Sequence, residues 1–204
     1  MSLARVQFFS ISLDGFGTGE GQSLETPFGH AGQRLHGWMF ATRWWRQIVG
    51  EPGGSSGIDD ALLRLHDPGV GAEIMGSGKF GPPGWHDDLE WKGWWGPNPP
   101  FHTPVFVLTH HPRPSIEMEG GTTFHFIEAS PSDALVRARD AAGGQDVRIG
   151  GGVSVIREFV APGSSTTCTS RWSRSSSAEA CASGTAWRAS RRTIRSKQSP
   201  RPAG

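Results

Sequence analysis

Residues 146–159 read DVRIGGGVSVIREF: a short run predicted to be a strand, three glycines, and a segment in which Val155, Ile156 and Phe159 share one helix face. Backbone N–H groups at a helix N-terminus point outward and carry partial positive charge. Glycines before them let a phosphate approach without a Cβ in the way. The stretch therefore predicts either an anion-binding corner or a tight strand–helix turn without a ligand.

Segments of the same two kinds alternate along the chain up to residue 163. The strand and helix patterns indicate strands at 5–13, 105–109 and 122–127, a strand that runs into a glycine turn within 71–80, and helices at 35–49, 61–66 and 131–142. Alternating strands and helices are typical of an α/β fold with a largely parallel sheet. In the predicted helix at 35–49, Trp38, Trp45 and Ile48 are expected to face the core.

The bulk composition is that of a single-domain protein. A chain of 204 residues is long enough to bury a sizeable core. No apolar run has the length of a membrane span and the N-terminus lacks a signal-peptide pattern, so we expect a cytoplasmic protein. Cys168 and Cys181 match no zinc spacing, and we expect no metal site.

The composition changes abruptly after Gly163. Residues 164–204 contain no Leu, Val, Phe or Met, but eleven Ser and seven Arg. Eight Lys and Arg against one Glu give this tail a formal charge of +7, so residues 1–163 of a chain of +1 carry −6. Such a tail cannot bury enough apolar surface to offset its ordering entropy. We therefore expect a folded domain at 1–163 and a disordered Ser/Arg-rich tail at 164–204.

Five segments, taken in order, resemble the dihydrofolate reductase superfamily, which includes the reductase domain of bacterial riboflavin biosynthesis. They are SISLDGF (10–16), EIMGSGKFGP (73–82), VFVLTHHPRP (105–114), EGGTTFHFI (119–127) and the IGGG-plus-helix unit from Ile149. The resemblance covers nearly all of residues 1–163. It implies a three-layer dihydrofolate reductase-like fold with a mostly parallel central sheet flanked by helices. It also implies an NADPH-dependent reductase that transfers hydride to a small heterocyclic or carbonyl substrate, pterin-like or similar to the phosphoribosylaminouracil of riboflavin synthesis.

Carried over by position, the resemblance implies cofactor contacts in three of these segments. The nicotinamide–pyrophosphate portion would contact Gly150, Gly151, Gly152 and Val153. The phosphates would contact Gly76, Ser77 and Lys79. The adenosine 2′-phosphate would contact Thr109 and His110. A lysine, hydroxyls and backbone amides suit a dianion. Many relatives have Arg where Ser77 stands, which leaves the choice between NADPH and NADH open. If His110 has no role in cofactor binding, it is simply a polar residue at the end of a strand.

Ser12 and Asp14 are the implied catalytic residues, because the resemblance places them where the first strand opens onto the nicotinamide. Asp14 is then a general acid or a substrate hydrogen-bonding group; otherwise it belongs to an ordinary Asp-Gly turn. Dihydrofolate reductases themselves carry a carboxylate on their first long helix, whereas residues 35–49 contain no acid. This departure argues against folate and leaves an alternative open, a catalytically inactive nucleotide-binding member.

Two further features allow alternatives. The Trp-rich loop at 85–95 is either one wall of a substrate pocket or packs only on its own domain. Relatives often pair as dimers, so a homodimer is an expected assembly. We also expect the protein to bind a small-molecule substrate. Nucleic acid is not an expected partner, and the basic tail is the segment that would bind it.

The tail has two interpretations. A basic, Ser-rich segment is typical of nucleic-acid-binding or phosphorylated tails. The other interpretation is a shifted reading frame. Residues 164–177 (SSTTCTSRWSRSSS) can be written with GC-rich codons. When the same bases are read from one base earlier, they can encode the amino-acid string LVDDLHLAVVPVLL. That string resembles the strand that the family has directly after the glycine-corner helix. On this hypothesis the C-terminal strands are missing or disordered, and an inner strand becomes an exposed edge.

Overall fold

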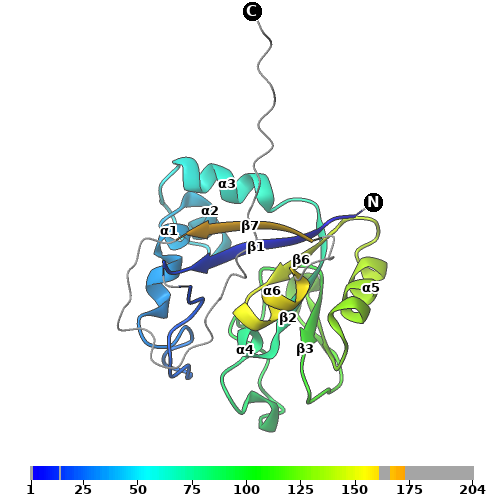
Figure 1. Cartoon of the computed structure of the whole chain (residues 1–204). Helices are drawn as coiled ribbons and strands as arrows, with labels where there is room; N and C mark the ends of the chain where they lie inside the picture. Colours follow the sequence, from blue (N-terminus) through cyan, green and yellow to red (C-terminus); the bar gives the residue numbers. More distant parts are fainter. Residues whose placement is uncertain (1, 14, 161–165, 173–204) are drawn as a thin grey trace, which may run out of the picture.

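The computed structural model describes residues 2–13, 15–160 and 166–172. Seven strands form one sheet in the order β4-β5-β3-β2-β6-β1-β7 (Figure 1). They are β1 (Ala4–Ile11), β2 (Val70–Gly76), β3 (Pro104–Leu108), β4 (Ile116–Glu117), β5 (Thr123–Ile127), β6 (Asp146–Gly150) and β7 (Thr166–Trp172). All neighbouring strands are parallel except β4 and β5. The predicted α/β class with a mostly parallel sheet is confirmed.

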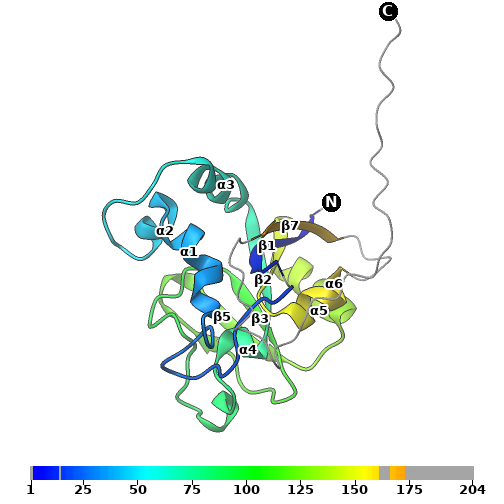
Figure 2. The same cartoon turned by 60° about the vertical axis from the view of Figure 1, so that its left-hand side comes forward.

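Helices cover both faces of the sheet, which gives three layers (Figures 1 and 2). The helices are α1 (Gly37–Phe40), α2 (Arg43–Ile48), α3 (Ile58–His66), α4 (Ser77–Phe80), α5 (Pro131–Ala141) and α6 (Val153–Phe159), with short 3-10 turns η1 (Gly32–His36), η2 (Trp85–Asp87) and η3 (Glu119–Gly121). The longest described helix, α5, has 11 residues, and among the described helices none combines the length and apolarity that a membrane span requires.

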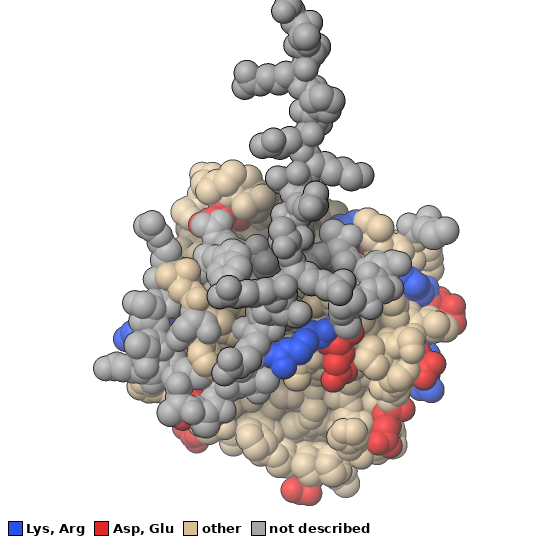
Figure 3. Space-filling model, in the orientation of Figure 1, with Lys and Arg blue, Asp and Glu red and all other residues tan. Residues whose placement is uncertain are grey.

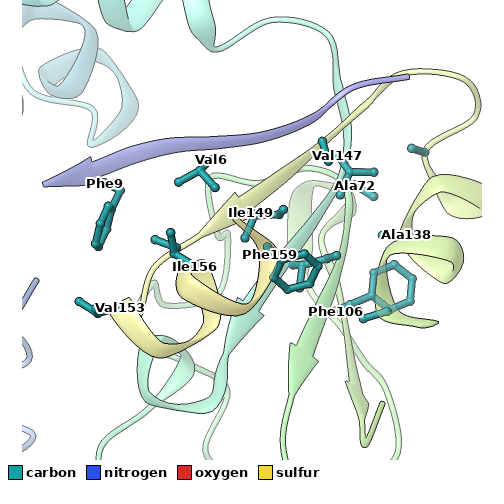
Figure 4. Close-up of a cluster of buried hydrophobic side chains, with 14 of the residues drawn as sticks. Val6, Phe9, Ala72, Phe106, Ala138, Val147, Ile149, Val153, Ile156 and Phe159 are labelled. Atoms are coloured by element: carbon teal, nitrogen blue, oxygen red, sulfur yellow. The ribbon is translucent and has the colours of Figure 1, made fainter. Parts of the chain in front are cut away.

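The larger core cluster lies between the sheet and the α5–α6 layer. Strand residues such as Val6 and Ile149 meet Ile156 and Phe159 of α6 there, and all four are almost completely buried (Figure 4). Alternate strand residues point to the opposite face. That face packs against α4 and the aromatic loop through a second cluster, and against α1–α3 through a third, which contains Trp44 and Leu63.

The predicted helix at 35–49 is wrong as a single element, because the chain forms η1, α1 and α2 instead. Thr42 takes an extended conformation and its side chain accepts a hydrogen bond from the N–H of Trp45, which starts α2 afresh. Asp60 from α3 accepts a second bond from the N–H of Trp44 at 2.6 Å. The restart buries Trp44 and leaves Ile48 38% exposed, contrary to the expectation for Ile48.

The expectation that the C-terminal strands are missing or disordered is wrong for Thr166–Trp172. These residues form β7, which follows α6 in the chain and pairs in parallel with β1. The physical reason is that a strand edge offers unpaired N–H and C=O groups to any extended segment, and three threonines in this one favour the extended state. Residues 164–165 and 173–204 of the predicted tail, and residues 161–163 of the predicted domain, lie outside the described residues.

Candidate functional site

The predicted cofactor residues lie on the segments that follow three neighbouring strands. β2 pairs with both β3 and β6, with Gly76 level with Leu108 and Met75 level with Gly150. Because the strands are parallel, α4, Thr109 and the glycine corner at 150–152 all leave the sheet at the same, carboxyl edge. In open α/β sheets this edge is where ligands bind.

β1 and β6 separate as they approach this edge. Their pairing begins with Ala4 and Val147 and ends with Val6 and Ile149. β1 nevertheless continues to Ile11, whereas β6 ends at Gly150, so among the described strands the carboxyl half of β1 pairs only with β7. The carboxyl ends of parallel strands, beside a strand–helix corner, are where open α/β sheets bind ligands.

The glycines at 151 and 152 are required by the backbone. Their φ angles are +70° and +80°, in the left-handed region that favours glycine. Gly152 is the N-cap residue of α6, and among the described residues no side-chain cap hydrogen bond is found at this helix start. A Cβ placed on Gly152 would meet no atom within 4 Å. The corner therefore presents uncapped N–H donors beside open space, as an anion site requires.

Gly150 and Gly151 have an additional structural explanation. A Cβ on Gly150 would lie 2.5 Å from Nζ of Lys79 and 2.6 Å from Oε1 of Glu73, and one on Gly151 would collide with the Lys79 stem. Lys79 thus lies directly against the glycine corner. The first two glycines make room for this side chain, whereas Gly152 has no such internal neighbour.

A buried charge cluster lies below Lys79. Nζ of Lys79 donates to Oε1 of Glu73 at 2.7 Å, and Nε of Arg148 donates to Oε2 of Glu73 at 2.8 Å. Asp67 also contacts Arg148, at 3.4 Å. Burial alone would raise the pKa of Glu73, but the positive charges of Arg148 and Lys79 lower it overall, so Glu73 is ionised.

Sequence reasoning overlooked Glu73 and Arg148, although a signal was present. Each is a charged residue inside an otherwise apolar strand, in AEIM and DVRIG. Charged residues in such strands are rarely fully buried unless they are paired. Glu73 is 1% exposed and Arg148 8% exposed, and the two are level with each other on β2 and β6.

The predicted hydroxyl contacts already have partners in the fold. Oγ of Ser77 accepts a hydrogen bond from Nε1 of Trp85 at 2.9 Å. Thr109 is buried, and its Oγ1 accepts from the N–H of His111 at 3.0 Å. Either hydroxyl could still donate its own hydrogen to an anion, because each accepts rather than donates in these bonds.

His110 differs from Thr109 in its surroundings. Its side chain is 89% exposed and Nδ1 lies 3.0 Å from Oε1 of Glu128. The next residue, His111, stacks on His86 with ring centroids 3.7 Å apart. Glu128 adds a negative charge where the resemblance implies the 2′-phosphate, so His110 alone is a weak determinant of that group.

Ser12, one of the two predicted catalytic residues, closes the turn after β1. It is fully buried, and its Oγ accepts a hydrogen bond from the N–H of Phe16 at 2.9 Å. Its own N–H donates to the carbonyl of Phe16, also at 2.9 Å. The second predicted residue, Asp14, lies outside the described residues.

The long loop after β1 contacts two sides of the glycine corner. A Cβ on Gly17 would lie 2.5 Å from Val153, the first residue of α6. Nε2 of Gln22 donates to the carbonyl of Gly78 in α4 at 2.9 Å and equally to that of Pro27. This loop therefore lies against both α6 and α4.

The Trp-rich loop packs on its own domain. Trp85 is 4% exposed and meets the ring of Phe80 edge-on at 4.8 Å. Nε1 of Trp91 donates to the carbonyl of Phe80 at 3.2 Å, and Trp95 lies 5.9 Å from the ring of Phe124. These contacts account for the tryptophans without a substrate.

Charged side chains are mixed on the molecular face shown in Figure 3. Basic and acidic residues lie interspersed among the described residues of that face, with no extended area of one sign. Nucleic-acid binding depends on a continuous basic track along the phosphates. The part of this face that the structure describes offers no such track.

Comparison with protein-family models and with curated proteins identifies no relative. No protein-family model matches the chain, and no curated protein matches it.

Proposed function

We propose that the protein is an NADPH-dependent reductase of the dihydrofolate reductase-like superfamily, which transfers hydride to a small heterocyclic or carbonyl substrate. One observation carries the proposal: four of the five segments that resemble that superfamily leave the sheet at its carboxyl edge, after β1, β2, β3 and β6. Scattered matches without functional meaning would not be expected to converge there. The proposal includes a cytoplasmic location and a dihydrofolate reductase-like fold.

The glycine corner fits the diphosphate of a dinucleotide. Its N–H donors at the start of α6 are uncapped, and Gly152 borders open space. We assign Gly151, Gly152 and Val153 to the diphosphate, and Lys79 to the outer phosphate oxygens through its partly exposed ammonium. NADPH, when bound, would supply the hydride, and the protein would position it.

The described residues do more to orient a ligand than to transfer protons. Ser12 holds the turn that ends β1, so it acts on the shape of the site through Phe16. Gln22 keeps the following loop against α4, where it would limit the access of water. Asp14, two residues after Ser12 in the sequence, is the proposed acid or substrate hydrogen-bonding group.

A titration of NADPH against the full chain tests the proposal. Nine tryptophans report the binding, and Trp85 is bonded to Ser77 at the edge of the proposed site. We expect saturable quenching with NADPH and weaker quenching with NADH. If neither cofactor gives a saturable signal in a sample shown to be folded by circular dichroism, the proposal fails.

A catalytically inactive nucleotide-binding protein is the second candidate. It is favoured by the engagement of Ser12 with Phe16 and by the absence of acidic residues from 35–49. Such a protein would bind NADPH but would not oxidise it with any pterin, pyrimidinone or small carbonyl compound. Loss of NADPH absorbance in the presence of one of these compounds would exclude it.

A further inference from the structure

The Trp-rich loop at 85–95 reaches the proposed cofactor site through one hydrogen bond. Nε1 of Trp85 donates to Oγ of Ser77 at 2.9 Å. An indole N–H can only donate, so the Ser77 hydroxyl accepts this bond and keeps its own hydrogen. Among the residues that the structure describes, no acceptor for that hydrogen is found. Ser77 is half-buried, which leaves the residue partly open to a ligand.

Ser77 begins α4 beside the glycine corner. A Cβ on the preceding residue, Gly76, would lie 2.7 Å from Cγ2 of Val155 in α6. Lys79, two residues after Ser77, lies against the glycine corner itself. The residues on both sides of Ser77 therefore contact the corner or the helix that follows it. A phosphate held by Lys79 and the first N–H groups of α6 would lie near the Ser77 hydroxyl.

Arg113, on the segment after β3, holds Trp85 in place. Cζ of Arg113 lies 5.0 Å from the ring centroid of Trp85 and 4.5 Å from that of Phe126. A guanidinium at such distances from aromatic rings is attracted to them. The same guanidinium donates to the backbone carbonyl of Asp88 at 3.2 Å and to that of Trp91. One side chain thus fixes both the ring of Trp85 and the backbone of its loop.

A second contact joins the same two segments. His86, the residue after Trp85, stacks on His111, with 3.7 Å between the ring centroids and 6° between the ring planes. Trp85 itself is 4% exposed, so it is enclosed on all sides by the protein. Two contacts between one pair of segments restrict how the loop can turn, and they keep the Trp85 N–H directed at Ser77.

We infer that the Trp-rich loop positions a cofactor contact without touching the cofactor. Trp85 donates to Ser77 and thereby directs the Ser77 hydrogen to the phosphate, and Arg113 holds Trp85 in the geometry that this requires. Trp85 and Arg113 are then positioning residues for cofactor binding. The inference rests on the proposed function, because it needs a phosphate beside Ser77.

A double-mutant cycle on NADPH affinity, measured by calorimetry, tests the inference. Ser77→Ala removes the hydroxyl and should weaken binding about tenfold. Trp85→Phe keeps an aromatic ring without the N–H, and Arg113→Lys keeps the charge without the planar fork. Each of these two should weaken binding about threefold. In the Ser77→Ala background neither should cause a further loss, because no hydroxyl is left to position. Additive losses overturn the inference.

Trp91→Phe is the matched control for Trp85→Phe. Nε1 of Trp91 donates to the carbonyl of Phe80 at 3.2 Å, so this change also removes one indole hydrogen bond from the same loop. Urea denaturation should show a loss of stability in both variants, whereas NADPH affinity should fall only in Trp85→Phe. An equal loss of affinity in the two variants assigns the effect to loop stability and overturns the inference.

A failure of this inference is distinguishable from a failure of the proposed function. If the original chain and Trp85→Phe bind NADPH equally well, only the positioning role is overturned. If the folded original chain does not bind NADPH, the proposed function fails and the inference fails with it.

Discussion

Glu73 and Arg148 lie level with each other on β2 and β6 and form an almost completely buried ion pair, with 2.8 Å between Oε2 and Nε. Lys79 reaches the other carboxylate oxygen from α4, at the glycine corner. The cluster therefore joins the central strands to the proposed cofactor site. Its members have different exposures, which separates their expected contributions to stability and to binding.

Removing one charge of the buried pair is expected to destabilise the fold strongly. Arg148→Met leaves Glu73 with Lys79 as its remaining charged partner, and we expect a loss of about 3 kcal/mol in the free energy of unfolding. Urea denaturation measures it. Combining Arg148→Met with Glu73→Leu should recover part of the loss, because no buried charge then lacks its partner. Strict additivity of the two changes would contradict the pairing.

Lys79→Met should separate binding from stability. The Lys79 side chain is 28% exposed and Glu73 keeps Arg148, so we expect a stability loss of about 1 kcal/mol or less. NADPH affinity should fall about tenfold, because the ammonium beside the phosphates is lost. Fluorescence titration measures the affinity at two salt concentrations. An affinity equal to that of the original chain would remove Lys79 from the proposed site.

Gly152→Asp should block the cofactor, at a cost in stability that its control variant shares, because both glycines have a positive φ. The new carboxylate can accept hydrogen bonds from the first N–H groups of α6, which the diphosphate would otherwise occupy. We expect NADPH affinity to fall at least about tenfold. Gly144→Asp is the matched control, because Gly144 has a φ of +87° and equally open space but lies before β6, at the opposite edge of the sheet. Similar losses in both variants would indicate a general backbone effect.

His36 should make stability fall on acidification. Burial lowers its pKa to about 4 from an ordinary value of 6.5, and its ring lies 4.6 Å from that of Phe28. In the unfolded chain His36 takes up a proton below pH 6.5, whereas in the fold it does so only near pH 4. Stability is therefore complete above pH 6.5 and declines as pH falls to about 4, by roughly 3 kcal/mol at most.

Urea denaturation at pH 7 and pH 4.5 measures the effect of His36. His36→Phe should remove most of the pH dependence, because the ring stays and the titrating nitrogen is lost. His110→Gln is the control for the loss of a histidine at an exposed position, since its side chain is 89% exposed. An equal response of the original chain and His36→Phe would assign the pH dependence to other groups.

Local signals were sufficient for most regular elements. Helix α5 was expected at 131–142 and is found at Pro131–Ala141, because Ser130 caps its N-terminus by accepting a bond from the N–H of Asp133. The strand–glycine–helix unit around β6 and α6 was equally predictable, since its apolar spacing and its glycines act within a few residues. The parallel sheet follows from the alternation of such units, and with it the position of the site at the carboxyl edge.

Contacts between distant residues decided the rest. Residues 35–49 have helical spacing, yet Asp60 holds the N–H of Trp44 and the helix begins again after Thr42. No local pattern pairs Glu73 with Arg148, because 75 residues separate them in sequence. Thr166–Trp172 has too few apolar residues to predict a buried strand, but β1 offers it a row of backbone partners. Sequence alone determined which segments could form regular helices and strands. Tertiary structure decided which partners the buried polar groups found. The reason is that a buried polar group without a hydrogen-bond partner is costly, and its partner can lie anywhere in the chain.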